Sequence, residues 1–328
     1  MVDYFGREIN YMRISLTDRC NYRCKYCMPE EGVKDLGHEN ILTLEEIERI
    51  VRTAASLGIS KFRLTGGEPL VRKGIIELIK HLKVIPGVRE LTMTTNGALL
   101  GDMAKDLKAV GLDRVNISLD TLNHTRFKSI TRGGDLNDVI AGINAAVDAG
   151  LKPIKLNVVV MKEFNEDEIM DFVQMTFQHD YEIRFIELMP IGETAGQCEG
   201  GYVSNAQIKS RLPGLRPLSV NVDGEEEETA YGVAELYQYP GTRGKIGFIS
   251  PMSDCFCPSC NKLRLTADGK LKTCLHSNHE VDLKMALNSE DEGELKKTIE
   301  AAVLSKEEKH NLCEGAVPIE RNMNKIGG

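Results

Sequence analysis

The sequence predicts an α/β fold, a partial (β/α)6 barrel followed by a smaller C-terminal α+β domain that carries a second cysteine cluster. Short β-rich runs alternate with amphipathic stretches up to residue 190, which is typical of parallel β/α units with right-handed crossovers. Six such units are too few to close an eight-stranded barrel, so a partial barrel is expected. After Pro190 the alternation stops, and we predict domains of residues 1–190 and 191–328.

The strands expected in the first domain are short and well separated. They span Tyr11–Leu16, Lys61–Thr65, Glu90–Thr95, Arg114–Leu119, Ile154–Val160 and Glu182–Leu188. Two of the helical stretches open with a capping-box pattern, at Thr43–Glu46 and Asn165–Glu168. In such a box the first side chain and the glutamate exchange hydrogen bonds with each other's backbone, so each pattern predicts the start of a helix.

The second domain is expected to follow a linker rich in glycine and polar residues at 191–201. Its strand-like runs succeed one another without helices, at Ala234–Tyr239, Lys245–Ser250 and Leu263–Thr266. A run of glutamates at residues 224–228 is predicted to be a solvated loop. This arrangement differs from the β/α alternation before it and favours a separate α+β unit.

Composition and charge limit the classes of function that need to be considered. The chain has 328 residues, 41% of them hydrophobic, and a formal net charge of −8, which disfavours a surface for nucleic acid or anionic membrane. The first ten residues lack the apolar core of a signal peptide, and no apolar run approaches a membrane span. We therefore expect a cytoplasmic protein, where nine cysteines indicate metal or redox chemistry.

The first cysteine cluster follows the first predicted strand. Cys20, Cys24 and Cys27 have the spacing C-x3-C-x2-C on one short loop. Three thiolates can hold three irons of a [4Fe–4S] cluster and leave the fourth iron open to another ligand. A zinc site with its fourth ligand elsewhere in the chain is the alternative.

The context of this loop favours the iron–sulfur interpretation. The second strand ends in Gly66-Gly-Glu-Pro69, where glycine allows close backbone approach to a ligand and Glu68 supplies an acceptor. Together with the cysteine spacing, this motif resembles the radical S-adenosylmethionine (SAM) superfamily. The resemblance implies a radical SAM barrel in which the open iron chelates SAM and delivers the electron that cleaves it to a 5′-deoxyadenosyl radical.

Basic residues occur where strands covered on both faces should be apolar. Lys61 and Arg63 alternate on the second strand, and Arg13, Lys155 and Arg184 interrupt three others. Buried cations need anions, which are either carboxylates of the core or a bound polyanion. Their recurrence on four strands favours a triphosphate at the carboxyl ends of the strands, beside Thr94-Thr-Asn-Gly97.

The second cysteine cluster has the spacing C-x2-C-x13-C, formed by Cys257, Cys260 and Cys274. The segment Ala267-Asp-Gly-Lys270 predicts a tight hairpin turn that folds Cys274 back beside the other two. The spacing is compatible with a second cluster that has an open iron. It is equally compatible with zinc, with Cys255 or His276 as the fourth ligand. Cys198 and Cys313 are expected to be ordinary thiols.

From Phe5-Gly-Arg7 to Asn324-Lys-Ile-Gly-Gly328 the chain resembles the GTP 3′,8-cyclase family, most specifically in Cys260-Asn-Lys-Leu-Arg-Leu-Thr-Ala-Asp-Gly269. The resemblance implies that the second triad holds a [4Fe–4S] cluster that binds the guanine of GTP. It implies SAM contacts at Tyr26, Gly67, Ser118 and Met189, beside Glu68 of the motif. It implies GTP contacts at Arg13, Arg63, Thr94, Lys155, Lys262, Leu263 and Arg264, with Lys61 and Arg184 as further basic positions. A tail like Gly327-Gly328 enters the active site in this family.

The activity implied is conversion of GTP to 3′,8-cyclo-7,8-dihydro-GTP, the first step of molybdenum cofactor biosynthesis. The radical would take hydrogen from C3′, and the carbon radical would attack C8 of guanine. Expected partners are GTP, an external electron donor, cyclic pyranopterin monophosphate synthase as the next enzyme, and a second copy in a homodimer. The family frequently has arginine at the position of Lys262. Lysine keeps the positive charge but lacks the planar guanidinium group that can bind phosphate or guanine in a bidentate manner.

Two other classes of protein are compatible with parts of the pattern. A radical SAM peptide or protein maturase would also carry an auxiliary cluster, but usually in a longer cysteine-rich extension than this one. A non-catalytic zinc or iron–sulfur protein would need neither the Gly66–Pro69 motif nor the cations on the strands. Release of 5′-deoxyadenosine that depends on GTP distinguishes the cyclase from both.

Overall fold

The computed structural model describes residues 1–32, 36–191, 201–218, 233–254, 256–289, 291, 293–309, 319 and 321–327. Several residues singled out from the sequence lie outside the described residues, namely Cys198, Cys255, Cys313, Gly328, the linker residues 192–200 and the glutamate run 224–228. Within the described ranges, no helix has the length and apolar character needed to cross a membrane.

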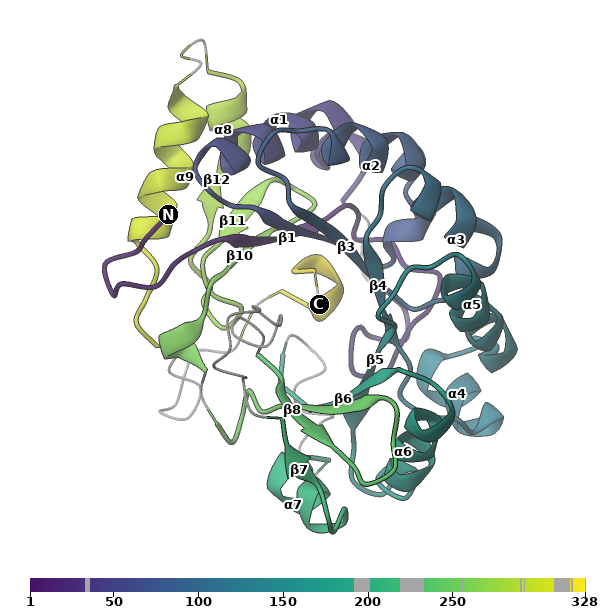
Figure 1. Cartoon of the computed structure of the whole chain (residues 1–328). Coiled ribbons are helices and arrows are strands. Elements are labelled where there is room, and N and C mark those ends of the chain that lie inside the picture. The colour runs from purple at the N-terminus through teal and green to yellow at the C-terminus, as the bar shows by residue number, and fades with distance from the viewer. Residues whose placement is uncertain are drawn as a thin grey trace.

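The six strands predicted for the first domain all form, and each end lies within one residue of the expected position. They are β1 Tyr11–Ser15, β2 Lys61–Thr65, β3 Glu90–Thr95, β4 Arg114–Ser118, β5 Lys155–Val160 and β6 Glu182–Glu187. Neighbours in the chain pair in parallel, and the sheet curves so that its strands surround a central space (Figure 1). The partial barrel predicted from the sequence is confirmed.

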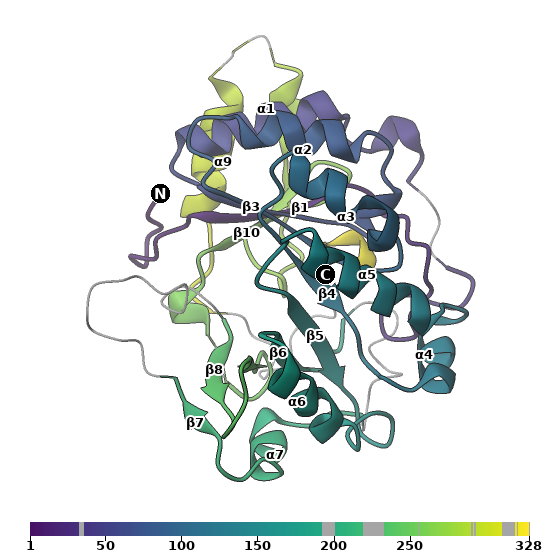
Figure 2. The same ribbon diagram turned by 45° about the vertical axis from the view of Figure 1, so that its right-hand side comes forward.

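Helices cover the outside of this curved sheet (Figures 1 and 2). They are α1 Leu44–Ser56, α2 Ile75–Lys83, α3 Leu100–Ala109, α4 His124–Thr131, α5 Leu136–Asp148 and α6 Ile169–Gln178, with short 3-10 turns η1 His38–Asn40 and η2 Pro69–Val71. Their apolar faces pack on Met12 and Ile14 of β1 and on Phe62 and Leu64 of β2, all essentially inaccessible to solvent. Because side chains alternate along a strand, the residues between these point into the central space.

One capping box is confirmed and the other prediction is wrong. At α1, the Glu46 N–H donates to the Thr43 hydroxyl at 3.1 Å and the Thr43 N–H donates to the Glu46 carboxylate at 2.7 Å. Asn165 caps no helix, because α6 begins at Ile169 with Glu168 as its N-cap. The Asn165 amide instead accepts from the Met161 N–H and donates to the Asp120 carbonyl, which ties two loops of the barrel together.

The residues after 190 extend the same sheet at both edges. The strands are β7 Arg216–Pro217, β8 Glu235–Gln238, β9 Lys245–Ile249, β10 Lys262–Leu265, β11 Lys270–Lys272 and β12 Val281–Asp282. The other elements are α7 Asn205–Ser210, α8 Leu283–Leu287, α9 Glu294–Leu304, η5 Cys257–Ser259 and η6 Met323–Lys325. Strand β10 pairs in parallel with β1 and β9 with β6, giving the order β12-β11-β10-β1-β2-β3-β4-β5-β6-β9-β8-β7.

This topology places the second cysteine cluster beside the first strand of the barrel. The predicted hairpin forms between β10 and β11, which are antiparallel, with the Thr266 N–H donating to the Lys270 carbonyl at 2.9 Å. The last described residues, including η6, lie within the ring of strands (Figure 1). The barrel interior is therefore bounded by elements from both halves of the chain. The division at residue 190 stays a prediction.

Candidate active site

The first cysteine loop is held in place by the backbone of α4. The N–H groups of Arg23 and Lys25 each donate at 3.0 Å to carbonyls at the end of that helix, those of Thr131 and Ile130. Within the loop, the Cys27 N–H donates to the Cys24 carbonyl at 2.9 Å. These bonds fix a short turn on which Cys20, Cys24 and Cys27 all carry free thiols.

The three thiols of this loop lie close enough to influence one another. Burial raises the pKa of Cys24 well above its usual value, and the charges of Cys27, Asp120 and Cys20 raise it further. Burial and the charge of Cys20 raise the pKa of Cys27 to about 12. A cation shared by the three sulfurs would relieve this repulsion and release their protons. The donor set therefore fits an iron–sulfur cluster with three protein ligands.

The Gly66–Pro69 motif packs directly on the cysteine loop. The Gly67 N–H donates to the Thr17 carbonyl at 2.7 Å, and a Cβ atom on Gly67 would lie 2.3 Å from the Arg19 carbonyl oxygen. Any side chain at this position would therefore displace the loop. Glu68 is buried, and its carboxylate accepts from the Leu70 N–H, the Thr95 hydroxyl and the Asn96 N–H at 2.7–3.0 Å. Burial raises its pKa to about 7 despite these bonds.

A second carboxylate, Asp120, organises the side of the site that Tyr26 occupies. Asp120 follows β4, is 7% exposed, and accepts from the Tyr26 hydroxyl at 2.7 Å and the Val159 N–H at 2.9 Å. Burial raises the pKa of Asp120 to about 6. Together the two bonds link the cysteine loop to β5. Ser118 and Met189 line the same cavity as Tyr26 and Asp120.

The barrel encloses a cavity of about 320 Å³ that brings together most of the predicted site residues. Those that line it are Arg13, Tyr26, Lys61, Arg63, Thr94, Ser118, Lys155, Arg184, Met189, Cys257, Cys260, Lys262, Arg264 and Cys274. Residues far apart in the sequence therefore converge on one space, as expected for a binding site.

Other predicted residues do not line this cavity with their side chains. Cys20, Cys24 and Cys27 lie on the adjoining loop, with Gly67 and Glu68 packed against it. Leu263 is fully buried in the apolar core behind β10, so a contact with a nucleotide would have to come from its backbone. The Gly327 carbonyl accepts from the Arg264 guanidinium at 3.0 Å, which places the tail beside the cavity.

The cations of the cavity fall into two groups. Lys155 and Arg184 share Glu182, at 3.2 and 2.5 Å, so for these two the carboxylates of the core do supply a counter-ion. Arg63 lies over the Tyr11 ring at 5.4 Å, and its Nε donates to the Thr92 hydroxyl at 3.2 Å. Within the described residues no carboxylate pairs with Arg63, Lys262 or Arg264.

Burial and mutual repulsion lower the pKa values of Arg63, Lys262 and Arg264, and also that of Arg13. Burial, together with the charge of Arg264, lowers the pKa of Arg13 to about 9. Burial lowers the pKa of Arg63 to about 10. Burial and the charge of Arg264 lower the pKa of Lys262 to about 7. Cations packed this closely are stabilised by a bound polyanion. The cavity is therefore chemically suited to a polyphosphate.

The second triad is assembled from two segments. Cys257 is the first residue of η5 and Cys260 directly follows that turn, while Cys274 follows β11. All three thiols are free, and the buried Arg7 side chain, paired with Asp3, donates to the Cys257 carbonyl at 3.0 Å.

The charges around the second triad differ from those around the first. Burial would raise the pKa of Cys260, but the charges of Lys306 and Lys262 bring it below its usual value. Burial raises that of Cys274, and the His276 N–H and the charge of Lys306 oppose the rise. The donor set fits a metal centre with three thiolate ligands. His276 also lines the cavity, but among the described residues no three His, Cys, Asp or Glu side chains are grouped as ligands of a single metal ion, which disfavours the zinc alternative.

Several polar residues of the cavity were not recognised from the sequence. These are Tyr11, Glu90, Arg114, Asn116, Asp120, Asn157 and Asn261. A signal was present, because Arg114, Asn116 and Ser118 alternate on β4 in the same way as Lys61 and Arg63 on β2. Arg114 pairs with Glu90 at 2.5 Å.

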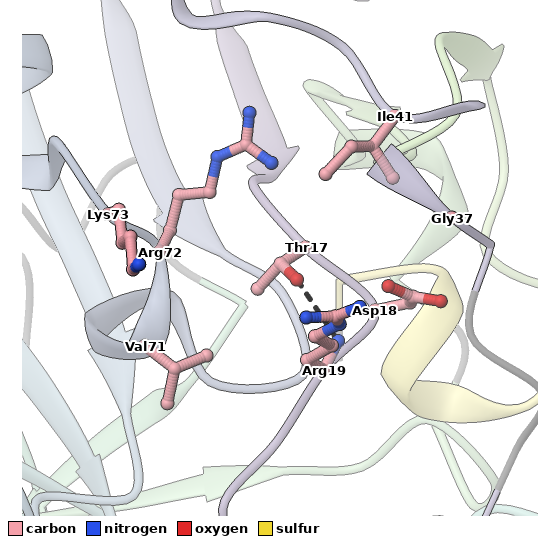
Figure 3. Close-up of a pocket in the computed structure, with 8 residues that line it drawn as sticks. All are labelled: Thr17, Asp18, Arg19, Gly37, Ile41, Val71, Arg72 and Lys73. Carbon is pink, nitrogen blue, oxygen red and sulfur yellow. Dashed lines mark hydrogen bonds between the residues drawn. The ribbon is translucent and has the colours of Figure 1, made fainter. Parts of the chain in front are cut away.

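A second cavity, of about 350 Å³, lies beside the segment that carries Thr17, Asp18 and Arg19 (Figure 3). Arg72 extends toward it, and the Arg19 N–H donates to the Thr17 hydroxyl at 3.1 Å (Figure 3). No residue predicted for the site lines this cavity among those that the structure describes. The candidate active site is therefore the cavity inside the barrel.

Comparisons with known proteins cover the chain from end to end. A model of the radical SAM superfamily matches residues 14–176, and a model described as Molybdenum Cofactor Synthesis C matches residues 181–312. A GTP 3′,8-cyclase of Alkaliphilus metalliredigens is 50% identical over 100% of both chains, and so is one of Moorella thermoacetica.

Solved structures show the same fold at low sequence identity. Streptococcus suis SuiB aligns over 97% of this chain and 77% of its own length, with a TM-score of 0.63 and 13% identity. The structure of SuiB bound to S-adenosylmethionine aligns with a TM-score of 0.61 over 97% of this chain and 77% of its own, at 14% identity. At this identity the likeness concerns the fold alone.

Proposed function

The chain belongs to the GTP 3′,8-cyclase family of radical SAM enzymes, and we propose that it converts GTP to 3′,8-cyclo-7,8-dihydro-GTP, the first step of molybdenum cofactor biosynthesis. The observation that carries the proposal is the cavity inside the barrel. A group of cations lines it together with the second cysteine triad, and Tyr26 of the loop that carries the first triad lines it as well; each triad has three free thiols. Neither a carrier protein nor a structural zinc protein needs such a cavity.

Cys20, Cys24 and Cys27 would hold the first [4Fe–4S] cluster and leave one iron for SAM. When bound, this cluster would supply the electron that cleaves SAM to methionine and the deoxyadenosyl radical, which can take hydrogen from C3′ of GTP so that C3′ bonds to C8; a further electron, originating from the external donor, and a proton then complete the dihydro product. The chain's part is to position the reactants. The Asp120 carboxylate holds the Tyr26 ring, while Ser118 and Met189 line the same part of the cavity.

The other half of the cavity is proposed to bind GTP. Arg13, Arg63, Lys155 and Arg184, with Lys61, present positive charge from strands β1, β2, β5 and β6 to the triphosphate. Thr94 supplies a hydroxyl, and Lys262 and Arg264 extend the positive charge toward the second triad. A second [4Fe–4S] cluster on Cys257, Cys260 and Cys274 would bind the guanine through its open iron.

The C-terminal tail contacts both halves of this site. The Asn324 amide donates to the Asp18 carbonyl at 2.9 Å, beside the first triad, and Gly327 accepts from Arg264. Ile326 is fully buried in a small apolar cluster with Ile191 and Ile319. We therefore propose that the end of the chain closes one side of the reaction cavity and orients Arg264 toward GTP.

Further partners are proposed with the activity. A one-electron donor must reach the first cluster, and cyclic pyranopterin monophosphate synthase would take up the product. We propose the cytoplasm as the compartment, because its thiols stay reduced. The homodimer stays a prediction.

The test is incubation of reconstituted, reduced protein with SAM and each nucleoside triphosphate in turn. We expect about eight irons per chain, and release of 5′-deoxyadenosine with a cyclised nucleotide only when GTP is present. A Cys24→Ala variant controls for cleavage of SAM by free iron. Deoxyadenosine formation that does not respond to GTP would contradict the proposal and favour a peptide or protein maturase.

A further inference from the structure

Three lysines are buried among the residues that the structure describes, and one of them differs from the others. Lys155 pairs with Glu182 at 3.2 Å, and Lys272 pairs with Glu280 at 3.3 Å. Lys306 is 3% exposed, and within the described residues no carboxylate lies within ion-pairing distance of it. A buried ammonium group without an anion is unfavourable, because it loses its hydration without compensation.

The position of Lys306 indicates where its anion should be. Its ammonium group donates to the Lys262 carbonyl at 3.1 Å and to the Thr273 carbonyl. Thr273 directly precedes Cys274, and Lys262 follows Cys260 by two residues. The two carbonyls belong to the two segments that assemble the second triad, so the charge lies between them. Its field acts on the sulfurs of both Cys260 and Cys274.

The neighbouring backbone fixes Lys306 in this place. Lys306 follows α9, and the buried Arg7 guanidinium donates to the carbonyls of Glu307 and Glu308 at 2.7 and 3.0 Å. The same guanidinium donates to the Cys257 carbonyl at 3.0 Å. One arginine therefore joins the Cys257 segment to the segment that carries Lys306. Hydrogen bonds therefore hold the backbone directly after Lys306 against the segment that carries Cys257.

We propose that Lys306 is a positioning residue for the second cluster, supplying the counter-charge to its cysteine ligands and tying together the two segments that carry them. This inference rests on the proposed function, which places an iron–sulfur cluster on that triad. Three thiolates give an oxidised four-iron cluster a net negative charge, and reduction makes it more negative. A fixed cation beside the ligands therefore stabilises the reduced form and raises the reduction potential.

The test uses full-length protein in which Cys20, Cys24 and Cys27 are replaced by alanine, so that any remaining cluster belongs to the second triad. Lys306→Gln removes the charge but keeps an amide donor, and Lys306→Arg keeps the charge. We expect the ratio of reduced to oxidised cluster at a fixed potential to fall about tenfold in Lys306→Gln, equivalent to about 59 mV for one electron, and to stay near the original value in Lys306→Arg.

A purely structural role would change iron retention in both variants and leave the potential unmoved. Equal potentials in the original protein and in Lys306→Gln, with iron content preserved, would overturn the proposal.

If the triad takes zinc instead of iron, the second cluster itself is contradicted, and the counter-charge is then tested by release of that zinc to a chelator. Faster release of zinc from Lys306→Gln than from Lys306→Arg would support the role of Lys306 as a counter-charge, and equal rates of release would overturn it. As an internal comparison, the potential of the first cluster, measured with the second triad replaced by alanine, should not respond to Lys306→Gln.

Discussion

The two cysteine triads are both largely buried, but they differ in how the chain assembles them and in the charge around them. The first lies on one contiguous loop, and the nearby carboxylates Glu68 and Asp120 add to the rise in the thiol pKa values that burial causes. The second is built from two segments, 257–260 and 274, and the charges of Lys306 and Lys262 hold the pKa of Cys260 below its usual value. Charge, more than burial, distinguishes the two regions.

This difference matches the two molecules that the proposed reaction needs. SAM carries a positive sulfonium group, which is compatible with the carboxylates near the first triad. GTP carries a triphosphate, which needs the cations that line the cavity toward the second triad. An anionic substrate is thus attracted to one end of the cavity and repelled from the other. The comparison predicts that substitutions in the two regions should affect SAM and GTP separately.

The largest effect is expected from removing a ligand of the first triad. Cys24→Ala should lower 5′-deoxyadenosine formation by more than about a thousandfold, because the cofactor carries the reaction and its cluster would be lost. Cys260→Ala is the matched variant in the second triad. It should abolish the cyclised nucleotide, while the first cluster still forms and still cleaves SAM when GTP is present, because the cations on the strands continue to bind the triphosphate. Iron content and deoxyadenosine release measure both, and equal loss of SAM cleavage in the two variants would contradict the separation.

The next largest loss of activity is expected from replacing Arg264, the cation that contacts the C-terminal tail. Arg264→Ala removes a buried guanidinium that lines the cavity and holds the Gly327 carbonyl. Because hydrogen bonds to charged groups contribute about 1.5–3 kcal/mol, kcat/KM for GTP should fall roughly 10- to 150-fold. The absorption spectrum of the first cluster should be unchanged. Arg52→Ala, at an exposed ion pair on α1, is the control and should leave both properties unaltered.

The first triad could be predicted from the sequence because all of its information is local. Its spacing, the strand before it and the Gly66–Pro69 motif are each contained in a few consecutive residues, and the strand ends were located for the same reason. The Asn165 capping box failed because a tertiary contact with Asp120 uses that side chain. A local pattern does not reveal such competition.

The surroundings of the second triad depend on contacts between distant parts of the chain. Strand β10 pairs with β1, so that Arg13 lies in register with Arg264. No short pattern predicts this pairing, and none marks Lys306, whose partners are backbone carbonyls of remote segments. The alternation on β4 was the exception, since Arg114 and Asn116 were visible as polar residues in a strand.

A smaller effect is expected at the carboxylate that positions Tyr26. Asp120→Asn has one acceptor oxygen instead of two, so its amide can keep the bond from the Val159 N–H and then meets the Tyr26 hydroxyl as a donor, which replaces a charged hydrogen bond with a neutral one. The difference of about 1 kcal/mol corresponds to roughly a fivefold increase in KM for SAM. KM for GTP should not change, since Asp120 lies on the side of the cavity that is proposed to bind SAM. An increase in the KM for GTP alone would contradict the assignment of the two halves.

The smallest effect should come from Lys262→Arg. The Lys262 ammonium group lies 5.4 Å from the centre of the Phe256 ring and 6.0 Å from that of Tyr11, and a guanidinium can stack on such rings while it keeps the charge. We expect kcat/KM for GTP within about threefold of the original value. Lys262→Met, which removes the charge, should cost more, roughly tenfold. A tenfold loss in Lys262→Arg as well would show that the shape of this residue matters more than its charge, and that electrostatics alone does not distinguish the second triad from the first.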